Sequence, residues 1–311
     1  MSGTESSSAR RFSSVSFAAV AGFSILLIGC AGALAGEPVS QRDISFDADG
    51  FRVVGTLVEP AMSGRHPIVL ILHGMGGRRH GPRVRGTGGT LFGEIARDWA
   101  ARGVASLRIS TGGRGGSAGE FVDMTLERRT REAVAAIRWI ARQPQFDTGR
   151  ITVLGHSQGS LIAAAAGKRL RNTVTPAASV VLWAPQANAL DTYRRSMGFA
   201  TYEKGIHAKP GEVVRWRGIG RQARAFRRNF FTGLSDFDAV ADIRAYGGPV
   251  LIVTGRRDRW APGWKARAFS KSGAPVTFKS FDVGHRMGAD RGIDAVREVS
   301  KATLDWLLRH E

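Results

Sequence analysis

A serine flanked by two glycines at 155–159, in the sequence Gly-His-Ser-Gln-Gly, has the spacing of a nucleophile in acyl transfer. The β-branched and aliphatic residues Ile151 to Leu154 come before it, and a helical pattern of small residues follows it. A strand, a sharp turn and a helix in this order expose a serine Oγ, and they pass too closely for a Cβ at the flanking glycines. We therefore predict that Ser157 is a nucleophile in a strained backbone conformation.

A second Gly-x-Ser-x-Gly sequence occurs at 115–119 and would give Ser117 the same role. The chain contains 40 glycines, so chance matches are expected. Residues Thr111 to Arg114 precede this copy in place of a strand, and no helical pattern follows directly. The same segment lacks the Gly-Lys-Ser/Thr ending of a phosphate-binding loop. We interpret 111–119 as a turn and Ser117 as a loop serine.

A serine hydroxyl needs a base to take its proton, and the base needs a carboxylate that fixes its tautomer. His285 follows a predicted strand in Asp-Val-Gly-His, and Asp258 follows another in Thr-Gly-Arg-Arg-Asp. Functional residues of a parallel sheet gather beyond the carboxyl ends of its strands. We predict a catalytic triad of Ser157, Asp258 and His285.

Other residues of the same types are less well placed. His156 lies inside the turn and is predicted to point away from the serine Oγ. Asp236 and Asp238 follow an irregular segment, and Asp282 is so close to the predicted base that it is expected to face elsewhere. The alternative for Asp258 is a surface turn residue paired with a neighbouring arginine.

Acyl transfer also needs hydrogen-bond donors where the oxyanion of the tetrahedral intermediate develops. The backbone N–H of Gln158, first in the helix after the serine, is one predicted donor. The loop after the apolar run 67–72 supplies the second, for which we select the N–H of Met75. His73 begins this loop and is predicted to belong to the substrate site. The alternative for His73 and Gly74 is a simple strand-ending turn.

Strand and helix patterns alternate along most of the chain. The expected strands are 67–72, 104–109, 151–154, 179–183, 249–253 and 276–281, and the expected helices are 91–102, 124–143, the segment after 159, and 293–308. A β-hairpin is predicted over 44–58. Unbroken apolar runs are typical of strands buried on both faces. The pattern predicts one α/β domain over 37–311 with a doubly wound, mostly parallel sheet.

Residues from about 185 to 235 interrupt this alternation and are interpreted as a short helical cap insertion. They contain ten Lys or Arg and three acidic residues. Apolar residues recur at spacings of three and four from Ile219 to Leu234, which predicts an amphipathic lid helix. The helix packs over the core or, as the alternative, meets anionic lipid or an acidic ester. We hypothesise that Phe226 and Phe230 line the acyl pocket.

From about Pro67 to its end the chain resembles bacterial serine α/β-hydrolases, most closely the cinnamoyl/feruloyl esterase-like branch. The resemblance is carried by His73-Gly74, Gly113-x-Gly115-x-Ser117-x-Gly119-x-Phe121 with Met124-Thr125, Gly155 to Gly159, Ala184-Pro185, Pro249 to Ile252 with Gly255-x-x-Asp258, and Gly284-His285. It implies the α/β-hydrolase fold and hydrolysis of small carboxylic esters by the triad and oxyanion donors named above. Relatives usually carry an acidic residue where this chain has Ser110, and its cap differs from those that recognise a phenolic acid. A feruloyl substrate is therefore not implied.

Two other functions remain as alternatives. A serine aminopeptidase of the same fold needs carboxylates near its cleft to hold a substrate ammonium group, and the cap is poor in them. A non-catalytic surface-binding module would not need the complete set of nucleophile, base, acid and oxyanion loop. No metal-ligand spacing or cofactor motif is present, so we expect neither a metal nor a cofactor.

The formal net charge of the 311-residue chain is +19, and 38 of its 45 basic residues are arginine. Such a charge attracts nucleic acid, anionic lipid or acidic substrates. The arginines are scattered, however, and form no basic run of about five to eight residues. We therefore expect solvated basic faces, a small-molecule ester as the substrate, and no nucleic-acid partner.

The first 36 residues are predicted to be a targeting segment. Arginines at 10 and 11 precede an uncharged stretch that ends in an Ala-Leu-Ala cleavage sequence at 33–35. The domain is expected to be exported and periplasmic, secreted or anchored outside the cytoplasm. Cys30, the only cysteine, ends a Leu-Ile-Gly-Cys sequence that resembles a lipoprotein lipobox. It is either lipidated, which would attach the protein to a membrane, or removed; an uncleaved anchor is the third alternative.

Overall fold

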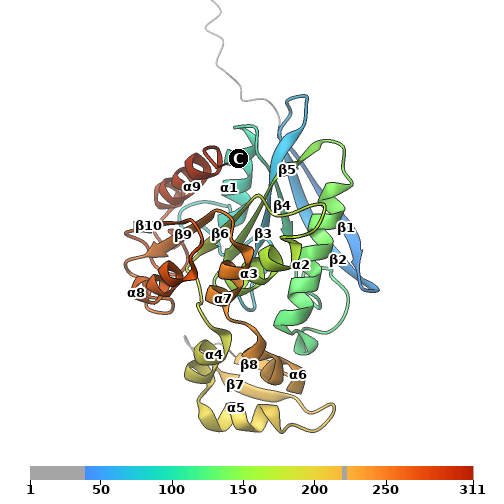
Figure 1. Ribbon diagram of the computed structural model, residues 1–311, viewed down its shortest axis with the longest axis vertical. Helices are drawn as coiled ribbons and strands as arrows, with labels where there is room; N and C mark the ends of the chain where they lie inside the picture. The colour runs from blue at the N-terminus through green and yellow to red at the C-terminus, as the bar shows by residue number, and fades with distance from the viewer. Residues whose placement is uncertain (1–38, 219–222, 311) are drawn as a thin grey trace, which may run out of the picture. The chain divides into compact units, whose positions relative to one another are not determined.

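Eight strands form the main sheet, and their order determines where the chemically active side chains meet (Figure 1). The structure, a computed structural model, describes residues 39–218 and 223–310. The strands are β1 (Ser40–Ala48), β2 (Phe51–Glu59), β3 (His66–Leu72), β4 (Ala105–Ile109), β5 (Phe146–His156), β6 (Ser179–Trp183), β9 (Val250–Gly255) and β10 (Val276–Phe281). They are ordered β1-β2-β4-β3-β5-β6-β9-β10. Strand β2 runs antiparallel to both its neighbours, and the six strands from β4 to β10 run parallel.

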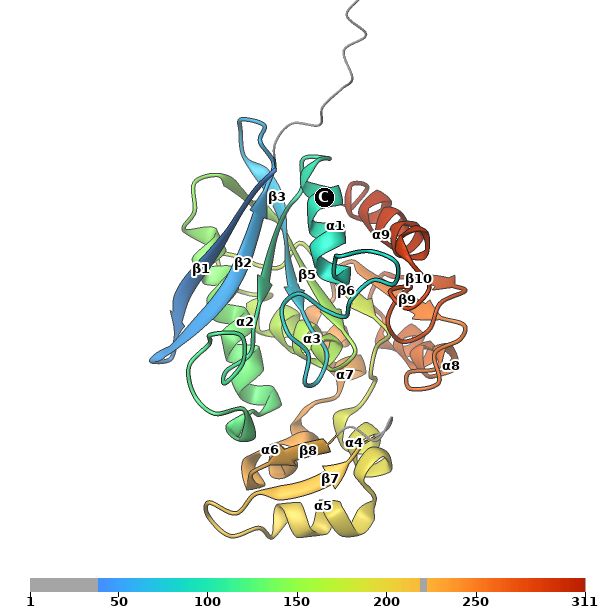
Figure 2. The same cartoon turned by 180° about the vertical axis from the view of Figure 1, so that it is seen from behind.

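Helices cover both faces of this sheet (Figures 1 and 2). The longer ones are α1 (Leu91–Ala100), α2 (Leu126–Ala141), α3 (Gln158–Leu170), α7 (Ala239–Tyr246) and α9 (Ile293–Leu307), and the short α8 (Gly263–Ala266) follows β9. Helices α1 and α9 lie together on one face, while α2, α3 and α7 cover the other.

Alternate residues of the central strands supply the apolar contacts of the two faces. In β3, Val69 packs into the buried cluster on the α1 and α9 side, and Leu70 packs into the cluster on the α2 and α3 side. Burial on both faces explains the unbroken apolar runs in the sequence. The predicted doubly wound, mostly parallel sheet is confirmed.

Two parts of the sequence prediction fall outside this description. The predicted targeting segment over 1–36, with Cys30, lies outside the described residues. So do residues 219–222 in the cap. Within the described ranges, no helix is both long and apolar enough to cross a membrane.

The cap, residues 185–235, lies beyond the carboxyl ends of the parallel strands (Figures 1 and 2). It contains α4 (Ala189–Met197), α5 (Phe199–Ile206), β7 (Val214–Arg217), β8 (Ala223–Phe226) and α6 (Arg228–Thr232). Strands β7 and β8 pair antiparallel.

The predicted lid helix over 219–234 is wrong, because its described part contains strand β8 and then the short helix α6. In the partner strand β7, Val214 and Trp216 are buried while Arg215 and Arg217 are exposed, which is the period of two of a strand. Pairing with β7 satisfies the backbone of 223–226 and overrides the spacing of three and four seen in the sequence.

The junction of β5 and α3 leaves no room for a side chain at Gly155 or Gly159. A Cβ on Gly155 would lie 2.1 Å from the carbonyl oxygen of Gly159, and a Cβ on Gly159 would lie 2.2 Å from that of Leu72. These are backbone atoms at the centre of the fold, so they cannot turn aside as a flexible side chain would. The predicted need for glycine at both positions is confirmed.

We expect Gly159→Ala to lower the free energy of unfolding by about 3 kcal/mol or more, because overpacking a close backbone contact forces the sheet apart. The matched control is Gly233→Ala, where an added Cβ has no atom within 4 Å and φ is negative. It should change stability by less than about 1 kcal/mol. Urea unfolding followed by circular dichroism measures both, and equal stabilities of the two variants would contradict the close approach.

Candidate active site

Ser157 occupies the turn between β5 and α3 in a backbone conformation that few residues adopt. Its φ is 55° and its ψ is −121°. A positive φ is costly for a residue with a Cβ and persists only where neighbours impose it. The Ser157 N–H donates to the Trp183 carbonyl oxygen at 2.9 Å, and its own carbonyl accepts from the Ser160 hydroxyl at 2.6 Å. The predicted strained conformation is confirmed.

The hydroxyl of Ser157 is hydrogen-bonded to a histidine that is in turn held by a carboxylate. Ser157 Oγ lies 2.9 Å from His285 Nε2, and His285 Nδ1 lies 2.8 Å from Asp258 Oδ2. The three residues follow β5, β9 and β10 at the same edge of the sheet. In this arrangement Nδ1 carries the ring proton and donates a hydrogen bond to the carboxylate, so Nε2 can accept the proton of the serine.

Asp258 is fixed as an acceptor. It is 4% exposed, and its Oδ1 accepts from the backbone N–H of Trp260 at 2.8 Å and of Ala261 at 2.9 Å. Burial tends to raise the pKa of Asp258, but the hydrogen bond and charge of His285, with these two N–H groups, outweigh burial and hold the pKa below its usual value. The carboxylate therefore stays ionised and leaves only Oδ2 for the histidine.

The rival residues have other partners. The hydroxyl of Ser117 accepts from the N–H of Val54 at 2.9 Å and donates to the Ser110 carbonyl at 2.9 Å, so it closes a loop, as predicted. Asp282 forms ion pairs with Arg257 and Arg291, while the carboxylate bonded to the histidine is that of Asp258.

The loop after β3 passes directly beside the nucleophile. A Cβ on Gly74 would lie 3.1 Å from the Cβ of Ser157. Met75 follows in this loop, and Gln158 begins α3 on the other side. Among the described residues, no protein group accepts a hydrogen bond from the backbone N–H of Met75 or of Gln158. Both N–H groups are therefore available to an oxyanion at the position next to Ser157.

His73 lines the cavity, but its ring nitrogens hold the loop. Nδ1 donates to the Gly74 carbonyl oxygen at 2.7 Å, and Nε2 accepts from the N–H of Thr111 at 3.4 Å. Burial, with the charge of Arg129, lowers the pKa of His73 to about 3, so the ring is neutral, as these two contacts require. The structure thus places His73 at the cavity wall, where its hydrogen bonds hold the loop, and its role beside a substrate stays a prediction.

A buried arginine that was not predicted from the sequence links the loop after β3 to the start of α3. Arg129 of α2 is 4% exposed and donates to Gln158 Oε1 at 2.6 Å and to the His73 carbonyl at 2.7 Å. Gln158 Nε2 in turn donates to the hydroxyl of Tyr193 in the cap helix α4 at 2.8 Å. Nothing distinguishes Arg129 from the other 37 arginines in the sequence, so no pattern pointed to it.

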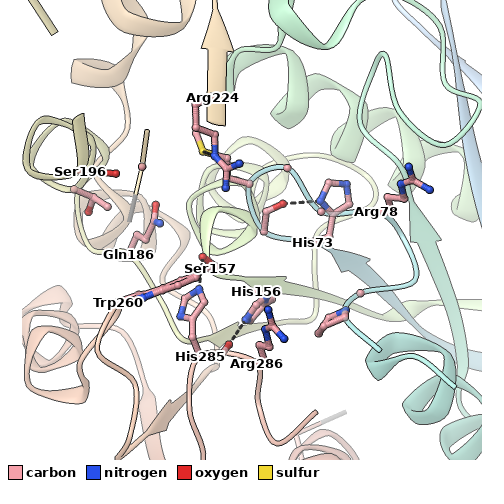
Figure 3. A pocket seen from close by; sticks show the side chains of 18 of the residues that line it. His73, Arg78, His156, Ser157, Gln186, Ser196, Arg224, Trp260, His285 and Arg286 are labelled. Carbon is pink, nitrogen blue, oxygen red and sulfur yellow. Dashed lines mark hydrogen bonds between the residues drawn. The ribbon is translucent and has the colours of Figure 1, made fainter. Parts of the chain in front are cut away.

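His156 also has a role that the sequence did not reveal. It points away from the serine, as predicted, and its Nε2 donates to the His285 carbonyl oxygen at 2.7 Å (Figure 3). Burial lowers the pKa of His156 to about 4, which keeps the ring neutral. The turn that carries Ser157 thereby restrains the backbone of His285, whose imidazole is bonded to the serine. The only indication of this role in the sequence was the position of a histidine directly before Ser157 in the sequence 155–159.

A cavity of about 490 Å³ opens over Ser157 and extends to the cap. Figure 3 shows Ser157 and His285 on one side of it and Ser196 and Arg224 of the cap across from them. Its lining contains four arginines and, among the described residues, no carboxylate; the arginines are Arg78, Arg83, Arg224 and Arg286.

The hypothesis that Phe226 and Phe230 line the acyl pocket is wrong. They are 0% and 2% exposed and are absent from the cavity lining. Their rings stack at 4.3 Å, and Trp216 packs against both at 5.7 and 6.0 Å. Trp216 lines the cavity and packs against both rings, and the two phenylalanines behind it belong to the buried core of the cap.

Comparisons with known proteins agree with this fold. The model of the X-Pro dipeptidyl-peptidase (S15 family) matches residues 49–224, more than half of the chain. The curated protein "Uncharacterized peptidase YtmA" of Bacillus subtilis (strain 168) is 26% identical over 228 residues, which are 72% of this chain and 75% of that protein.

Two solved structures illustrate the shared architecture. Est1E from Butyrivibrio proteoclasticus, with ferulic acid bound, has a TM-score of 0.68 at 21% identity and covers 86% of this chain and 98% of its own. The alpha/beta hydrolase GrgF from Penicillium sp. sh18 has a TM-score of 0.65 at 17% identity and covers 87% of this chain and 99% of its own. At these identities the likeness shows the fold alone, and that fold is the predicted α/β-hydrolase fold.

Proposed function

Since the chain belongs to the X-Pro dipeptidyl-peptidase (S15) family and is a serine hydrolase of the α/β-hydrolase fold, we propose that it cleaves carboxylic esters through an acyl-enzyme on Ser157. The observation that carries the proposal is the hydrogen-bonded series of Ser157, His285 and Asp258 at the wall of the cavity. A nucleophile, a base within reach of its proton and a carboxylate behind the base are the parts that acyl transfer needs.

The reaction follows from these contacts. His285 Nε2 takes the proton of Ser157 as Oγ attacks the ester carbonyl carbon. The carbonyl electron pair moves onto oxygen, where the N–H groups of Met75 and Gln158 stabilise the charge. His285 then gives its proton to the departing alkoxide, and the acyl group stays on Ser157. Water attacks the acyl-enzyme by the same steps in reverse, with His285 again as the base, and releases the acid.

The charges of the cavity favour esters over peptides with a free amino terminus. A peptidase that reads such a terminus must hold an ammonium group, for which a carboxylate is the natural partner. Among the described residues, the cavity lining offers arginines and no carboxylate. The alternative, a peptidase of the same fold, is favoured by the family description and by the name of the Bacillus relative.

Turnover of two substrate classes separates these functions. We expect hydrolysis of p-nitrophenyl esters, tested from short to long acyl chains, and no cleavage of alanyl or alanyl-prolyl p-nitroanilide. Ser157→Ala is the control for each signal. Anilide cleavage that depends on Ser157 would replace the esterase by the peptidase. No turnover of any of these compounds by the wild type would instead indicate a binding module that keeps the fold.

We also propose that the enzyme acts outside the cytoplasm. The support is the basic, then apolar N-terminal sequence that ends in Ala-Leu-Ala at 33–35. Cys30 would supply a lipid anchor if the chain is processed as a lipoprotein. Mass spectrometry of the mature N-terminus after expression in a bacterial host distinguishes cleavage after Ala35 from a lipidated Cys30.

A further inference from the structure

Three cap residues whose side chains carry hydrogen-bond donors lie around one position on the cavity wall. That position is Gly218, where a Cβ would lie 3.5 Å from Ser196 Oγ, 3.6 Å from Trp216 Nε1 and 3.8 Å from Arg224 Cγ. All four residues line the cavity over Ser157. We call Ser196, Trp216 and Arg224 the cap donor cluster. They come from α4, β7 and β8, so the fold of the cap brings them together.

The cap donor cluster contains donors that the protein does not use. Trp216 is 7% exposed, and its indole Nε1 is buried with no hydrogen-bond partner in the part of the chain that the structure describes. Among the described residues, nothing bonds to the hydroxyl of Ser196. A buried N–H that stays unpaired is destabilising, and most buried polar groups therefore have a partner. An unpaired indole N–H on the wall of a substrate cavity indicates a ligand atom that accepts from it.

The charge of the cavity identifies that acceptor as anionic. Arg224 is half-buried beside the unpaired donors, and its Nε donates to Met75 Sδ at 3.1 Å. Arg78, Arg83 and Arg286 are exposed along the lining, and among the described residues none of these three forms an ion pair. A concave site with cations and no carboxylate concentrates anionic ligands and repels cationic ones.

We propose that the substrate is an anionic ester whose carboxylate is bound by Arg224, Trp216 Nε1 and Ser196 Oγ. The inference rests on the proposed function, because it concerns the ester that Ser157 attacks. Arg224 touches the side chain of Met75, whose N–H is one of the two proposed oxyanion donors. The carboxylate and the scissile ester are therefore separated by a short carbon chain. A guanidinium and two neutral donors match the lone pairs of a carboxylate.

The carboxylate can belong to either half of the ester. In a monoester of a dicarboxylic acid it is on the acyl part, and in an ester of a hydroxy acid it is on the alcohol part. Monoethyl glutarate represents the first and the butanoyl ester of 4-hydroxybutanoate the second. Each is compared with the neutral ester in which an isopropyl group replaces the carboxylate. The measured quantity is the charge preference, the ratio of kcat/KM for the anionic ester to kcat/KM for its neutral match.

The wild type should show a charge preference of about 10-fold or more for one of the two anionic esters, and that ester identifies the half that carries the charge. Arg224→Gln should reduce the preference by about 10- to 100-fold, mainly through KM of the anionic ester, because a charge-assisted hydrogen bond is lost. Trp216→Phe keeps an aromatic ring in the cap core, removes the N–H and should reduce the preference about 3- to 10-fold.

The matched control is Arg215→Gln. Arg215 is an exposed arginine of the same strand β7 and does not line this cavity. Its loss removes one positive charge from the cap and should leave the charge preference unchanged. A preference that falls equally in Arg215→Gln and Arg224→Gln would mean that the net charge of the cap, and not the cap donor cluster, selects the substrate, which overturns the proposal.

The remaining outcomes separate this inference from the function on which it rests. Neutral esters cleaved by wild type and not by Ser157→Ala, with no preference for either anionic ester, would overturn the anionic substrate and leave the esterase intact. A wild-type preference that survives in both Arg224→Gln and Trp216→Phe would assign the carboxylate to another place and also overturn the proposal. No Ser157-dependent ester hydrolysis at all would overturn the esterase itself.

Discussion

Ser157→Ala is expected to lower kcat for ester hydrolysis by about 10⁵- to 10⁶-fold, because the acyl-enzyme can no longer form. The remaining cavity still binds and polarises the ester, so KM should change little. Within residues 39–218 and 223–310 the hydroxyl makes no hydrogen bond besides that to His285, and the loss of Oγ should leave the fold intact. Stopped or endpoint assays with p-nitrophenyl esters measure kcat, and thermal unfolding checks the fold.

The second Gly-x-Ser-x-Gly sequence supplies the control for this variant. Ser117→Ala removes a hydroxyl that bonds Val54 and Ser110, so it should reduce stability. It should leave kcat within about 3-fold of the wild type, because among the described residues the partners of Ser117 are backbone groups and not a base. If Ser117→Ala abolished turnover and Ser157→Ala did not, the nucleophile would have been assigned to the wrong motif.

Asp258→Asn is expected to lower kcat by about 10⁴-fold while keeping the shape of the site. The amide oxygen can take the place of Oδ1 and accept from Trp260 and Ala261. The NH₂ group would then face His285 Nδ1, and two donors cannot share that contact. The imidazole would move its proton to Nε2, the atom that must accept the proton of Ser157. The loss should therefore appear in kcat much more than in KM.

Asp282→Asn is the matched control for that change. Asp282 is close to His285 in the sequence but pairs with Arg257 and Arg291 near the surface, so kcat should stay within about 2-fold of the wild type. An Asp258→Asn enzyme with wild-type kcat, or equal losses in the two variants, would contradict the assignment of Asp258 as the residue that orients the histidine.

The sheet could be predicted from the sequence because its signals are local and strong. Strands β6 and β10 occupy the ranges expected for them, 179–183 and 276–281, since both are short runs of β-branched and aromatic residues bounded by loops. The turn between β5 and α3 could be located because Gly155 and Gly159 each lie against backbone atoms that exclude a Cβ. Glycine is the only residue that fits there, so the constraint appears directly in the sequence.

The cap could not be predicted, because its structure depends on contacts between separate segments. The spacing of Ala223, Phe226 and Phe230 fits a helix, yet the pairing of β7 with β8 decides the conformation. The sequence does not show that Trp216 packs against Phe226 and Phe230, and the two phenylalanines were therefore expected to line the acyl pocket. Tertiary contacts of this kind override a period read from one segment.

The residues that hold the backbone of the active site could not be predicted from the sequence for a different reason. Arg129 and His156 hold the backbones of His73 and His285, and each does so through a single hydrogen bond to a carbonyl oxygen. Every residue has a backbone carbonyl oxygen, so the sequence does not show which residue accepts the hydrogen bond of a buried side chain. Asp258 and His285 bond through their side chains, and both residue types are visible in the sequence at the ends of predicted strands. Their pairing could therefore be predicted.

Covalent labelling tests the central claim, that Ser157 is the activated nucleophile of a serine hydrolase, most directly. The full-length enzyme is treated with a fluorophosphonate, which reacts with serines whose proton a neighbouring base removes. We predict one adduct per chain, located by peptide mass spectrometry on Ser157, with labelling slowed in Asp258→Asn and lost in Ser157→Ala. No adduct on Ser157 in the folded wild-type enzyme, or one on Ser117 instead, would contradict the account.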